Sequence, residues 1–121
     1  MEIGVDCVDI SRFDKSGMLF SNNLKRVFTE KEISYCEKKE NPAQHYAVRF
    51  AGKEAVKKAL SNYKIELSLS QIEILNGIDG IPFVNILNDN TNGLEIKISL
   101  SHSKTIAVAF AVINNKFDLD R

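Results

Sequence analysis

The sequence predicts a single α+β domain in which a long helix packs on a mostly antiparallel sheet. The helix is predicted by an uninterrupted pattern over residues 42–61 that is rich in Ala and Lys. The sheet is predicted by five short strand patterns, one before this helix and four after it. A chain of 121 residues, 44% of them hydrophobic, suffices for one core. No repeat or linker divides it, so residues 1–121 are taken as one domain.

The first predicted strand, over residues 2–10, contains an acid in an otherwise apolar pattern. Asp6 shares a face of this strand with Gly4 and Val8, because successive side chains of a strand alternate between faces. Residues 11–28 mix apolar side chains with helix breakers, and they predict short helical turns and loops.

Two helix starts are visible in the next part of the chain. Thr29 followed by Glu32 matches a capping box and predicts a short helix over residues 30–38. Asn41 is the predicted N-cap of the long helix, with Pro42 at its first position.

After residue 70 the hydrophobic pattern changes to period two, which predicts strands. We expect these strands at residues 71–75, 81–86, 95–101 and 105–113. Turn-like segments lie at residues 76–80 and 88–93. The last strand is apolar on both faces, as is typical of a central strand. The strand before it alternates, with Ile96, Ile98 and Leu100 expected to point inward.

Charge and cysteine content exclude several classes of protein. The chain has 16 basic and 16 acidic residues, which argues against binding nucleic acid or membranes by bulk charge. No apolar run approaches the roughly 18 residues of a membrane span, and no leader is visible, so we expect a cytoplasmic protein. Cys7 and Cys36 match no zinc spacing and are expected to be reduced, packed side chains.

The most informative anomaly is an acid on the apolar side of the long helix. Glu54 falls within the arc that contains Ala47 and Ala51, where a carboxylate is costly unless it is paired. The helix alone favours an ion pair with Lys58, four residues on; a metal ligand is the alternative. Asp6 could cap a turn, or could join Glu54 in binding a hard cation, since Mg²⁺ takes one or two carboxylates.

The basic residues of the long helix and His102 could be ordinary surface residues or part of a binding site. Arg49, Lys53 and Lys57 repeat every four residues along the helix, which is typical of a solvated face but would also suit a phosphate. His102 lies in the predicted turn between the last two strands, and is either without a role or part of a site. His45 is expected at the surface near the helix start.

Three segments together resemble the holo-acyl-carrier-protein synthases, the small single-domain 4'-phosphopantetheinyl transferases. These segments are Gly4–Asp6, Arg49–Ala55 and Ser99–His102, of which the second is the most specific. Their order and spacing cover most of the chain. The sequence Asp79-Gly80-Ile81-Pro82 also resembles a hairpin that precedes the histidine motif in the family.

The resemblance implies an activity and its partners. It implies Mg²⁺-dependent transfer of 4'-phosphopantetheine from coenzyme A to a serine of an apo acyl carrier protein, with release of adenosine 3',5'-bisphosphate, in fatty acid biosynthesis. It also implies a homotrimer with sites between subunits. The strand face bearing Ala107, Ala109 and Ala111, or the opposite face with Val108 and Phe110, could form the subunit contact.

Specific residues match the positions that the family uses. Asp6 and Glu54 match its magnesium carboxylates, so the metal-ligand interpretation now precedes the ion pair. The resemblance assigns catalysis to Asp6, Glu54 and Lys58, coenzyme A binding to Arg49, Lys53, Lys58 and His102, and carrier binding to Arg12, with Lys15, Lys25 and Arg26 as weaker candidates.

Two positions depart from the family pattern. Residues 61–65, directly after the long helix, contain no glycine, although a glycine-rich loop is usual there. Asp9 stands where the family usually has a glutamate. The alternative function is a non-catalytic relative that binds a carrier protein or coenzyme A.

Overall fold

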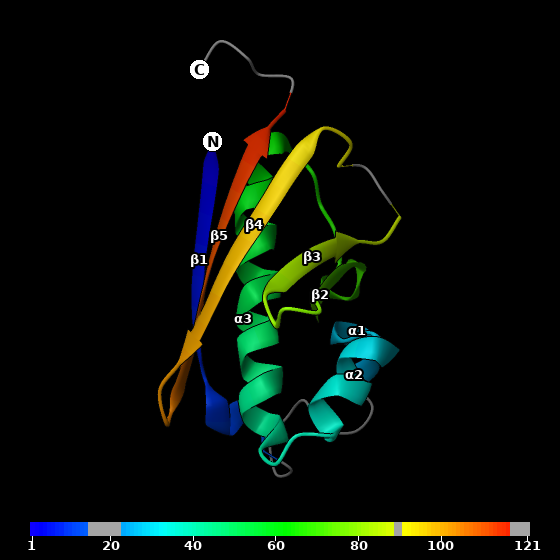
Figure 1. Cartoon of the computed structure of the whole chain (residues 1–121). Helices are drawn as coiled ribbons and strands as arrows, with labels where there is room; N and C mark the ends of the chain where they lie inside the picture. Colours follow the sequence, from blue (N-terminus) through cyan, green and yellow to red (C-terminus); the bar gives the residue numbers. More distant parts are fainter. Residues whose placement is uncertain (15–22, 89–90, 117–121) are drawn as a thin grey trace.

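The computed structural model describes residues 1–14, 23–88 and 91–116. Its strands and helices follow one another as shown in Figure 1. They are β1 (Glu2–Asp9), α1 (Leu24–Val27), α2 (Glu30–Glu37), α3 (Pro42–Leu60), β2 (Ile72–Asn76), β3 (Pro82–Ile86), β4 (Leu94–His102) and β5 (Ile106–Asn115), with 3₁₀ turns at Ile10–Phe13, Ser61–Tyr63 and Leu69–Gln71.

The strands form two separate antiparallel sheets rather than the one that was expected. β5 is the centre of a three-stranded sheet in the order β1-β5-β4, whereas β2 and β3 form a two-stranded ribbon. α3 packs along the three-stranded sheet, the β2–β3 ribbon lies beside β4, which β3 contacts, and α2 packs against α3 and β2 (Figure 1). The α+β prediction is therefore confirmed, but no ladder joins β3 to β4.

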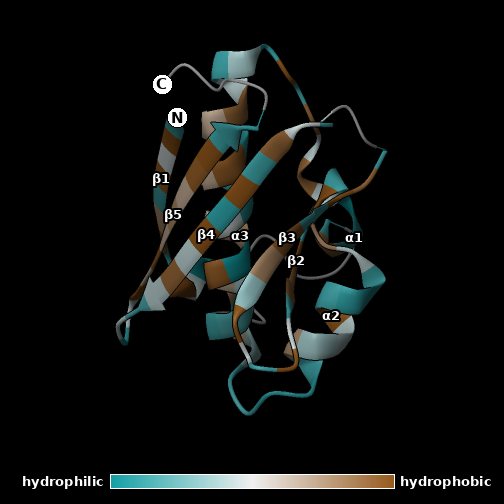
Figure 2. Cartoon of the chain, turned by 45° about the horizontal axis from the view of Figure 1, so that its top comes forward, coloured by the Kyte–Doolittle hydropathy of each residue, from teal (hydrophilic) through white to brown (hydrophobic). Residues whose placement is uncertain are grey.

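The three-stranded sheet has a buried face and an open one. Ala107, Ala109 and Ala111 are buried against α3, because small side chains let the helix lie close to the central strand. Figure 2 shows hydrophobic positions along β1 and β5. The large apolar side chains of the opposite face are 37–56% exposed: Ile3, Val5, Ile106, Val108 and Phe110. The alanine face is thus core, and only the opposite face is free to meet another molecule.

Two glycines of the sequence motifs permit close packing. A Cβ on Gly4 would lie 2.0 Å from the carbonyl oxygen of Ala55, so β1 could not lie this close to α3 with any larger residue. A Cβ on Gly52 would lie 2.5 Å from the Cδ1 atom of Ile74. Gly52 thereby makes room for a core side chain of the ribbon.

The predicted helix starts are confirmed in part. The capping box exists: the backbone N–H of Glu32 donates to Thr29 Oγ1 (3.3 Å), and that of Thr29 donates to Glu32 Oε1 (2.9 Å). Pro42 is the first residue of α3, but the Asn41 side chain makes no capping hydrogen bond. With φ −125° and ψ 80°, Asn41 departs from the extended backbone in which capping side chains reach the helix.

The cysteines and His102 differ in part from what the sequence predicted. Cys36 is buried as expected and its pKa is raised to about 12, mainly by burial, but Cys7 lies on the open face of the sheet and is exposed. His102 is the last residue of β4, paired with Ala107, rather than a turn residue. Within the described residues, no helix is long and apolar enough to span a membrane.

Candidate active site

Asp6 and Glu54 approach the same level of the β1–α3 contact. Gly4 lies against Ala55, and the chain directions of β1 and α3 are opposite (Figure 1). Asp6 is two residues farther along β1, about 6–7 Å, which equals the rise of slightly more than one helical turn. Asp6 therefore lies roughly level with residues 51–55 of α3, where Glu54 stands.

The ion pair predicted within α3 is not present. Lys58 Nζ instead crosses to β1, where it donates to Asp6 Oδ1 and to the carbonyl oxygen of Val5, each at 3.0 Å. Asp6 accordingly binds a helix lysine rather than capping a turn. Among the described residues, Glu54 has neither an ion pair nor a hydrogen bond and is half-buried.

This donor set fits a magnesium ion better than a transition metal. The described residues contain no group of three or more His, Cys, Asp or Glu side chains that could hold a metal ion, as the usual protein ligand sets of Zn²⁺ would require. Mg²⁺ needs fewer protein ligands, because it keeps several waters and takes substrate phosphate oxygens. Asp6, whose oxygen already neighbours a cation, and the unpaired Glu54 would be the residues that hold it.

Arg49 is buried rather than solvated. It is only 3% exposed, and its guanidinium donates to Asn76 Oδ1 at the end of β2 and to the carbonyl oxygen of His45. Its Cζ atom lies 4.0 Å from the centroid of the Tyr35 ring, in cation–π geometry. Within the described part of the chain, its Nε has no hydrogen-bond partner. The interpretation of this basic row as a solvated face is therefore wrong for Arg49.

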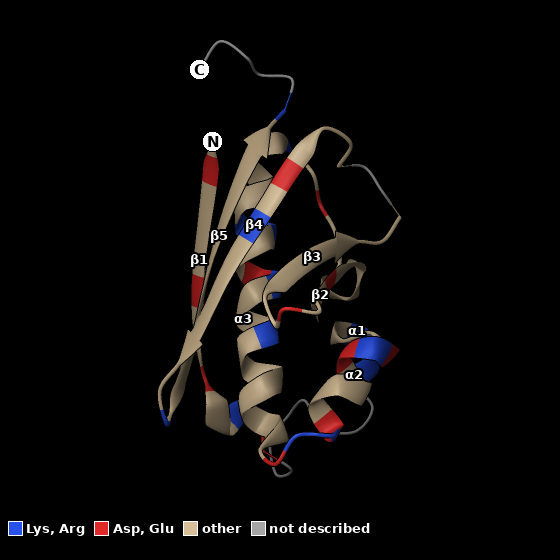
Figure 3. Ribbon diagram, viewed as in Figure 1, with Lys and Arg blue, Asp and Glu red and all other residues tan. Residues whose placement is uncertain are grey.

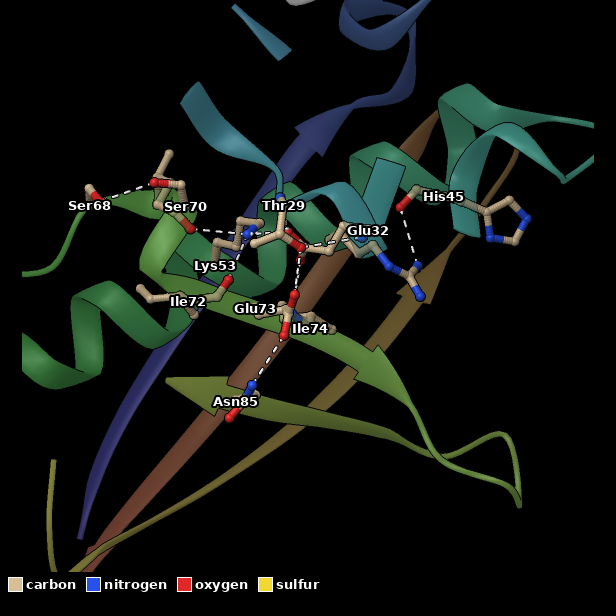
Figure 4. A network of polar contacts seen from close by, with 12 residues as sticks. Thr29, Glu32, His45, Lys53, Ser68, Ser70, Ile72, Glu73, Ile74 and Asn85 are labelled. Atoms are coloured by element: carbon tan, nitrogen blue, oxygen red, sulfur yellow. Dashed lines mark hydrogen bonds and ion pairs between the residues drawn. The ribbon is translucent and has the colours of Figure 1, made fainter. Parts of the chain in front are cut away.

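Lys53 is likewise buried, with no exposed surface. Figure 4 shows its ammonium among acceptors from several elements. Nζ lies 2.6 Å from Glu32 Oε1 and donates to the carbonyl oxygens of Leu69 (3.0 Å) and Ile72 (2.6 Å). Burial lowers the pKa of Lys53, and the Glu32 carboxylate opposes this shift. The prediction that Lys53 holds coenzyme A finds no support in this geometry, because direct contact would require these bonds to break.

His102 and His45 lie near the start of α3. Gln44 Nε2 and His102 Nε2 lie 2.8 Å apart, and His102 Nδ1 lies 3.1 Å from the carbonyl oxygen of Ser103, both within hydrogen-bond distance. His45 is half-buried, not a surface residue. Its pKa is lowered, first by burial and then by the charges of Arg49, Lys39 and His102.

Arg12 is exposed on the 3₁₀ turn after β1, with its guanidinium 5.4 Å from the ring centroid of Phe50. Lys25 and Arg26 are exposed on α1, and Lys15 lies outside the described residues. Basic and acidic positions are interspersed along the ribbon diagram (Figure 3). Any docking of an acidic partner would therefore depend on a few local charges.

The candidate residues form two groups that face different ways. Asp6, Glu54 and Lys58 line the edge where β1 meets α3, whereas Arg49 points toward α2 and the ribbon. Five residues separate Arg49 from Glu54, which places them about 140° apart around the helix. One chain therefore presents two half-sites rather than one closed pocket.

Several polar residues beside these groups were not identified from the sequence. Glu32 was recognised only as part of a capping box, and Gln44, Tyr35 and Asn76 have no pattern that marks them. Glu73 had a usable signal, because it is an acid between two isoleucines of a short strand; in the structure it is 4% exposed.

The loop after α3 achieves its turn without glycine. Lys64 adopts a left-handed backbone, with φ 58° and ψ 32°, a conformation that glycine adopts most easily. Its N–H donates to the carbonyl oxygen of Ser61 at 3.0 Å, and that of Ile65 donates to Leu60 at 3.3 Å. The departure from a glycine-rich loop thus leaves a strained lysine at the end of the helix.

Known proteins resemble the chain in sequence and in fold. A holo-[acyl-carrier-protein] synthase of Thermodesulfovibrio yellowstonii is 48% identical, covering 92% of this chain and 96% of the relative. A holo-[acyl-carrier-protein] synthase of Chloroherpeton thalassium is 42% identical, and the match covers 93% of this chain and 97% of that relative. The crystal structure of a holo-(acyl-carrier-protein) synthase from Bacillus anthracis in complex with CoA (3',5'-ADP) matches with a TM-score of 0.76 at 28% identity. The match covers 93% of this chain and 94% of that structure's chain.

A family model described as the 4'-phosphopantetheinyl transferase superfamily matches residues 2–111. This range contains the three segments on which the sequence resemblance rested. That resemblance is confirmed, and the chain belongs to the 4'-phosphopantetheinyl transferase superfamily.

Proposed function

We propose that this chain is a holo-[acyl-carrier-protein] synthase, which transfers 4'-phosphopantetheine from coenzyme A to a serine of an apo acyl carrier protein. Relatives that carry this name are 42% and 48% identical over more than nine-tenths of the chain. The observation that carries the proposal is the edge between β1 and α3, where Asp6 pairs with Lys58 and Glu54 has no partner among the residues that the structure describes.

The reaction is a phosphoryl-type displacement. The serine oxygen forms a bond to the pyrophosphate phosphorus that bears the pantetheine arm, and the bond from this phosphorus to the bridging oxygen breaks. The serine proton passes to a general base, a carboxylate or a water, and adenosine 3',5'-bisphosphate leaves. A magnesium ion held by Asp6 and Glu54 would neutralise charge on the pyrophosphate oxygens. Lys58, with its side chain 54% exposed, can turn its ammonium from Asp6 toward the same oxygens.

The second half-site would bind the nucleotide end of coenzyme A. Arg49, whose Nε has no hydrogen-bond partner among the described residues, would donate to phosphate oxygens, and His102 is the other residue that we propose to contact them. An approaching phosphate would favour the charged form of His45, whose pKa is lowered first by burial and then by the neighbouring charges of Arg49, Lys39 and His102. We do not assign a direct coenzyme contact to Lys53.

A homotrimer would bring the half-sites of different chains together. The open apolar face of the sheet, with Val108 and Phe110 exposed, can bury surface against another copy. The two half-sites face about 140° apart on α3, so a neighbouring chain can complete each of them. Sedimentation should detect an oligomer at micromolar concentration, and a stable monomer would exclude a shared site.

Arg12 would meet the acidic carrier protein. Charges at the rim of an interface mainly affect association rate and salt dependence. Arg12→Glu should therefore raise KM for the carrier and leave KM for coenzyme A nearly unchanged. We also propose a cytoplasmic location, in keeping with the two free thiols of the chain.

One experiment separates transfer from binding alone. The protein is incubated with coenzyme A, Mg²⁺ and an apo carrier, and the carrier is weighed by mass spectrometry. A carrier heavier by one phosphopantetheine supports the proposal. An unmodified carrier, together with measurable binding of carrier or coenzyme A, would favour the non-catalytic alternative.

A further inference from the structure

We propose that Lys53 and Glu32 form a positioning pair that fixes the β2–β3 ribbon and α2 on α3, and thereby places Arg49 for the coenzyme without touching it. This inference rests on the proposed function for its effect on the coenzyme. Its structural part stands on the contacts of the described residues alone.

The Lys53 ammonium has used its whole donor capacity. It has three N–H groups, and its three acceptors are Glu32 Oε1 and the carbonyl oxygens of Leu69 and Ile72. These acceptors belong to α2, to the 3₁₀ turn before β2, and to β2 itself. One lysine of α3 thus holds three other elements, and no N–H group remains for a phosphate.

The Glu32 carboxylate is the matching acceptor. Oε1 accepts from Lys53 and from the backbone N–H of Thr29, while Oε2 accepts from the backbone N–H of Ile74 at 2.8 Å. Glu32 is fully buried. It therefore connects its own helix to α3 through one oxygen and to β2 through the other.

The network continues across the ribbon, as Figure 4 shows. The Thr29 hydroxyl donates to Glu73 Oε2 at 2.6 Å, and Asn85 Nδ2 donates to Glu73 Oε1 at 3.1 Å. Asn85 lies on β3, directly opposite Glu73 in the ladder. The two strands of the ribbon are therefore both tied to the N-terminus of α2.

Position matters here because no ladder joins the ribbon to the larger sheet. Lys53 holds the start of β2 at Ile72, and Arg49, one turn earlier on α3, holds its end at Asn76. Loss of the first link would free the ribbon to shift and would take Asn76 away from Arg49. The guanidinium would then lose the partner that orients it.

A direct contact of Lys53 with coenzyme A and a positioning pair predict different effects of Glu32→Gln on KM for coenzyme A. If Lys53 bound a phosphate, removing the negative charge of Glu32 would leave KM for coenzyme A unchanged or lower it. A positioning pair predicts that Lys53→Met and Glu32→Gln both raise this KM, each by on the order of tenfold or more, because small displacements at a site have large kinetic effects.

The double variant Glu32→Gln/Lys53→Met supplies the second test. Neutral groups can replace a buried ion pair at little cost, whereas removing one partner strands a buried charge. We expect KM for coenzyme A in the double variant to lie closer to that of the unmodified protein than in either single variant. KM for the carrier should be unchanged in all three variants. Lys57→Met and Glu30→Gln, exposed neighbours on the same two helices, should change neither KM.

Hydrogen exchange without coenzyme tests the structural part separately. The Ile74 amide and its β2 neighbours should lose protection in each single variant and regain it in the double variant, while β5 amides stay protected. If a single variant does not fold, the double variant and Asn85→Ala carry the test, and Asn85→Ala should loosen β3.

The outcomes separate this inference from the proposed function. Unchanged protection of β2, or a lowered KM for coenzyme A in Glu32→Gln, would overturn the positioning pair. Loss of protection as expected, in a protein that modifies no carrier, would instead contradict the proposed function and leave the structural link standing.

Discussion

Lys53 and Lys58 stand five positions apart on α3, and each pairs with an acid from another element. The Lys53–Glu32 pair has a separation of 2.6 Å and both side chains are fully buried, whereas the Lys58–Asp6 pair measures 3.0 Å with side chains 54% and 17% exposed. A buried pair is costly to break, because the remaining charge is stranded. An exposed pair contributes little and exchanges easily. Burial therefore separates a fixed structural link from an acid that is available to a cation.

The largest expected effect concerns the available acids. Asp6→Asn and Glu54→Gln keep the size of the side chain but remove the charge that a metal needs. Each should lower the rate of transfer by about 10²-fold or more, close to 3 kcal/mol, because loss of a metal ligand removes stabilisation of charge in the transition state. Timed mass spectrometry of the carrier measures this rate, with Glu2→Gln on the same strand as the control.

Folding should survive both substitutions, because neither acid belongs to the buried network. Far-UV circular dichroism and a denaturation midpoint check this. If both variants unfold while their folded fraction transfers normally, the acids are structural and the proposed mechanism fails.

The second prediction compares the two lysines directly. Lys53→Met should lower the free energy of unfolding by about 3–5 kcal/mol, since it leaves Glu32 charged and buried. Lys58→Met should change it by no more than about 1 kcal/mol, as for other exposed pairs. Urea denaturation at neutral pH measures both. Equal effects would contradict the distinction drawn from burial.

The difference between these pairs could not be predicted from the sequence. Periodicity correctly predicted the long helix, the capping box at Thr29 and the central strand. It also placed Lys53 in a row with Arg49 and Lys57, but only Lys57 is exposed. Helical spacing shows which side chains share a strip of α3, not which other element covers that strip. The cover here comes from α2 and the ribbon, through contacts that span up to 44 residues of sequence.

The candidate site was predicted better in its residue types than in its contacts. Asp6 and Glu54 stood out because acids are unusual on apolar faces; in the structure Lys58 of α3 binds Asp6, and Glu54 stands about one helical turn before Lys58. Lys58 was expected to pair with Glu54 within the helix, but it binds Asp6 instead. Local spacing favours the first pair, whereas the close approach of β1 at Gly4 makes the second possible.

The third prediction concerns the cation at the exposed pair. Without coenzyme, Lys58→Met should strengthen Mg²⁺ binding by roughly thirtyfold at low salt, since a charge of +1 about 4 Å from a divalent cation costs about 2 kcal/mol in water. Transfer should nevertheless fall, because Lys58 is proposed to hold the pyrophosphate. Isothermal titration at two salt concentrations measures the affinity, and the gain should shrink at high salt. An affinity that does not change would mean that Lys58 does not compete for Asp6.

The smallest effect is expected at Lys64, an exposed lysine whose backbone decides its contribution to stability. A left-handed conformation costs a non-glycine residue about 1–2 kcal/mol, and glycine costs about 0.5–1 kcal/mol in lost chain entropy. Lys64→Gly should therefore raise the free energy of unfolding by about 0.5 kcal/mol. Lys57 is also exposed but lies inside α3, so Lys57→Gly should lower the free energy of unfolding by about 1 kcal/mol. Urea midpoints of both variants measure the difference. A loss of stability in Lys64→Gly would show that the lysine side chain, rather than the turn, is what this position requires.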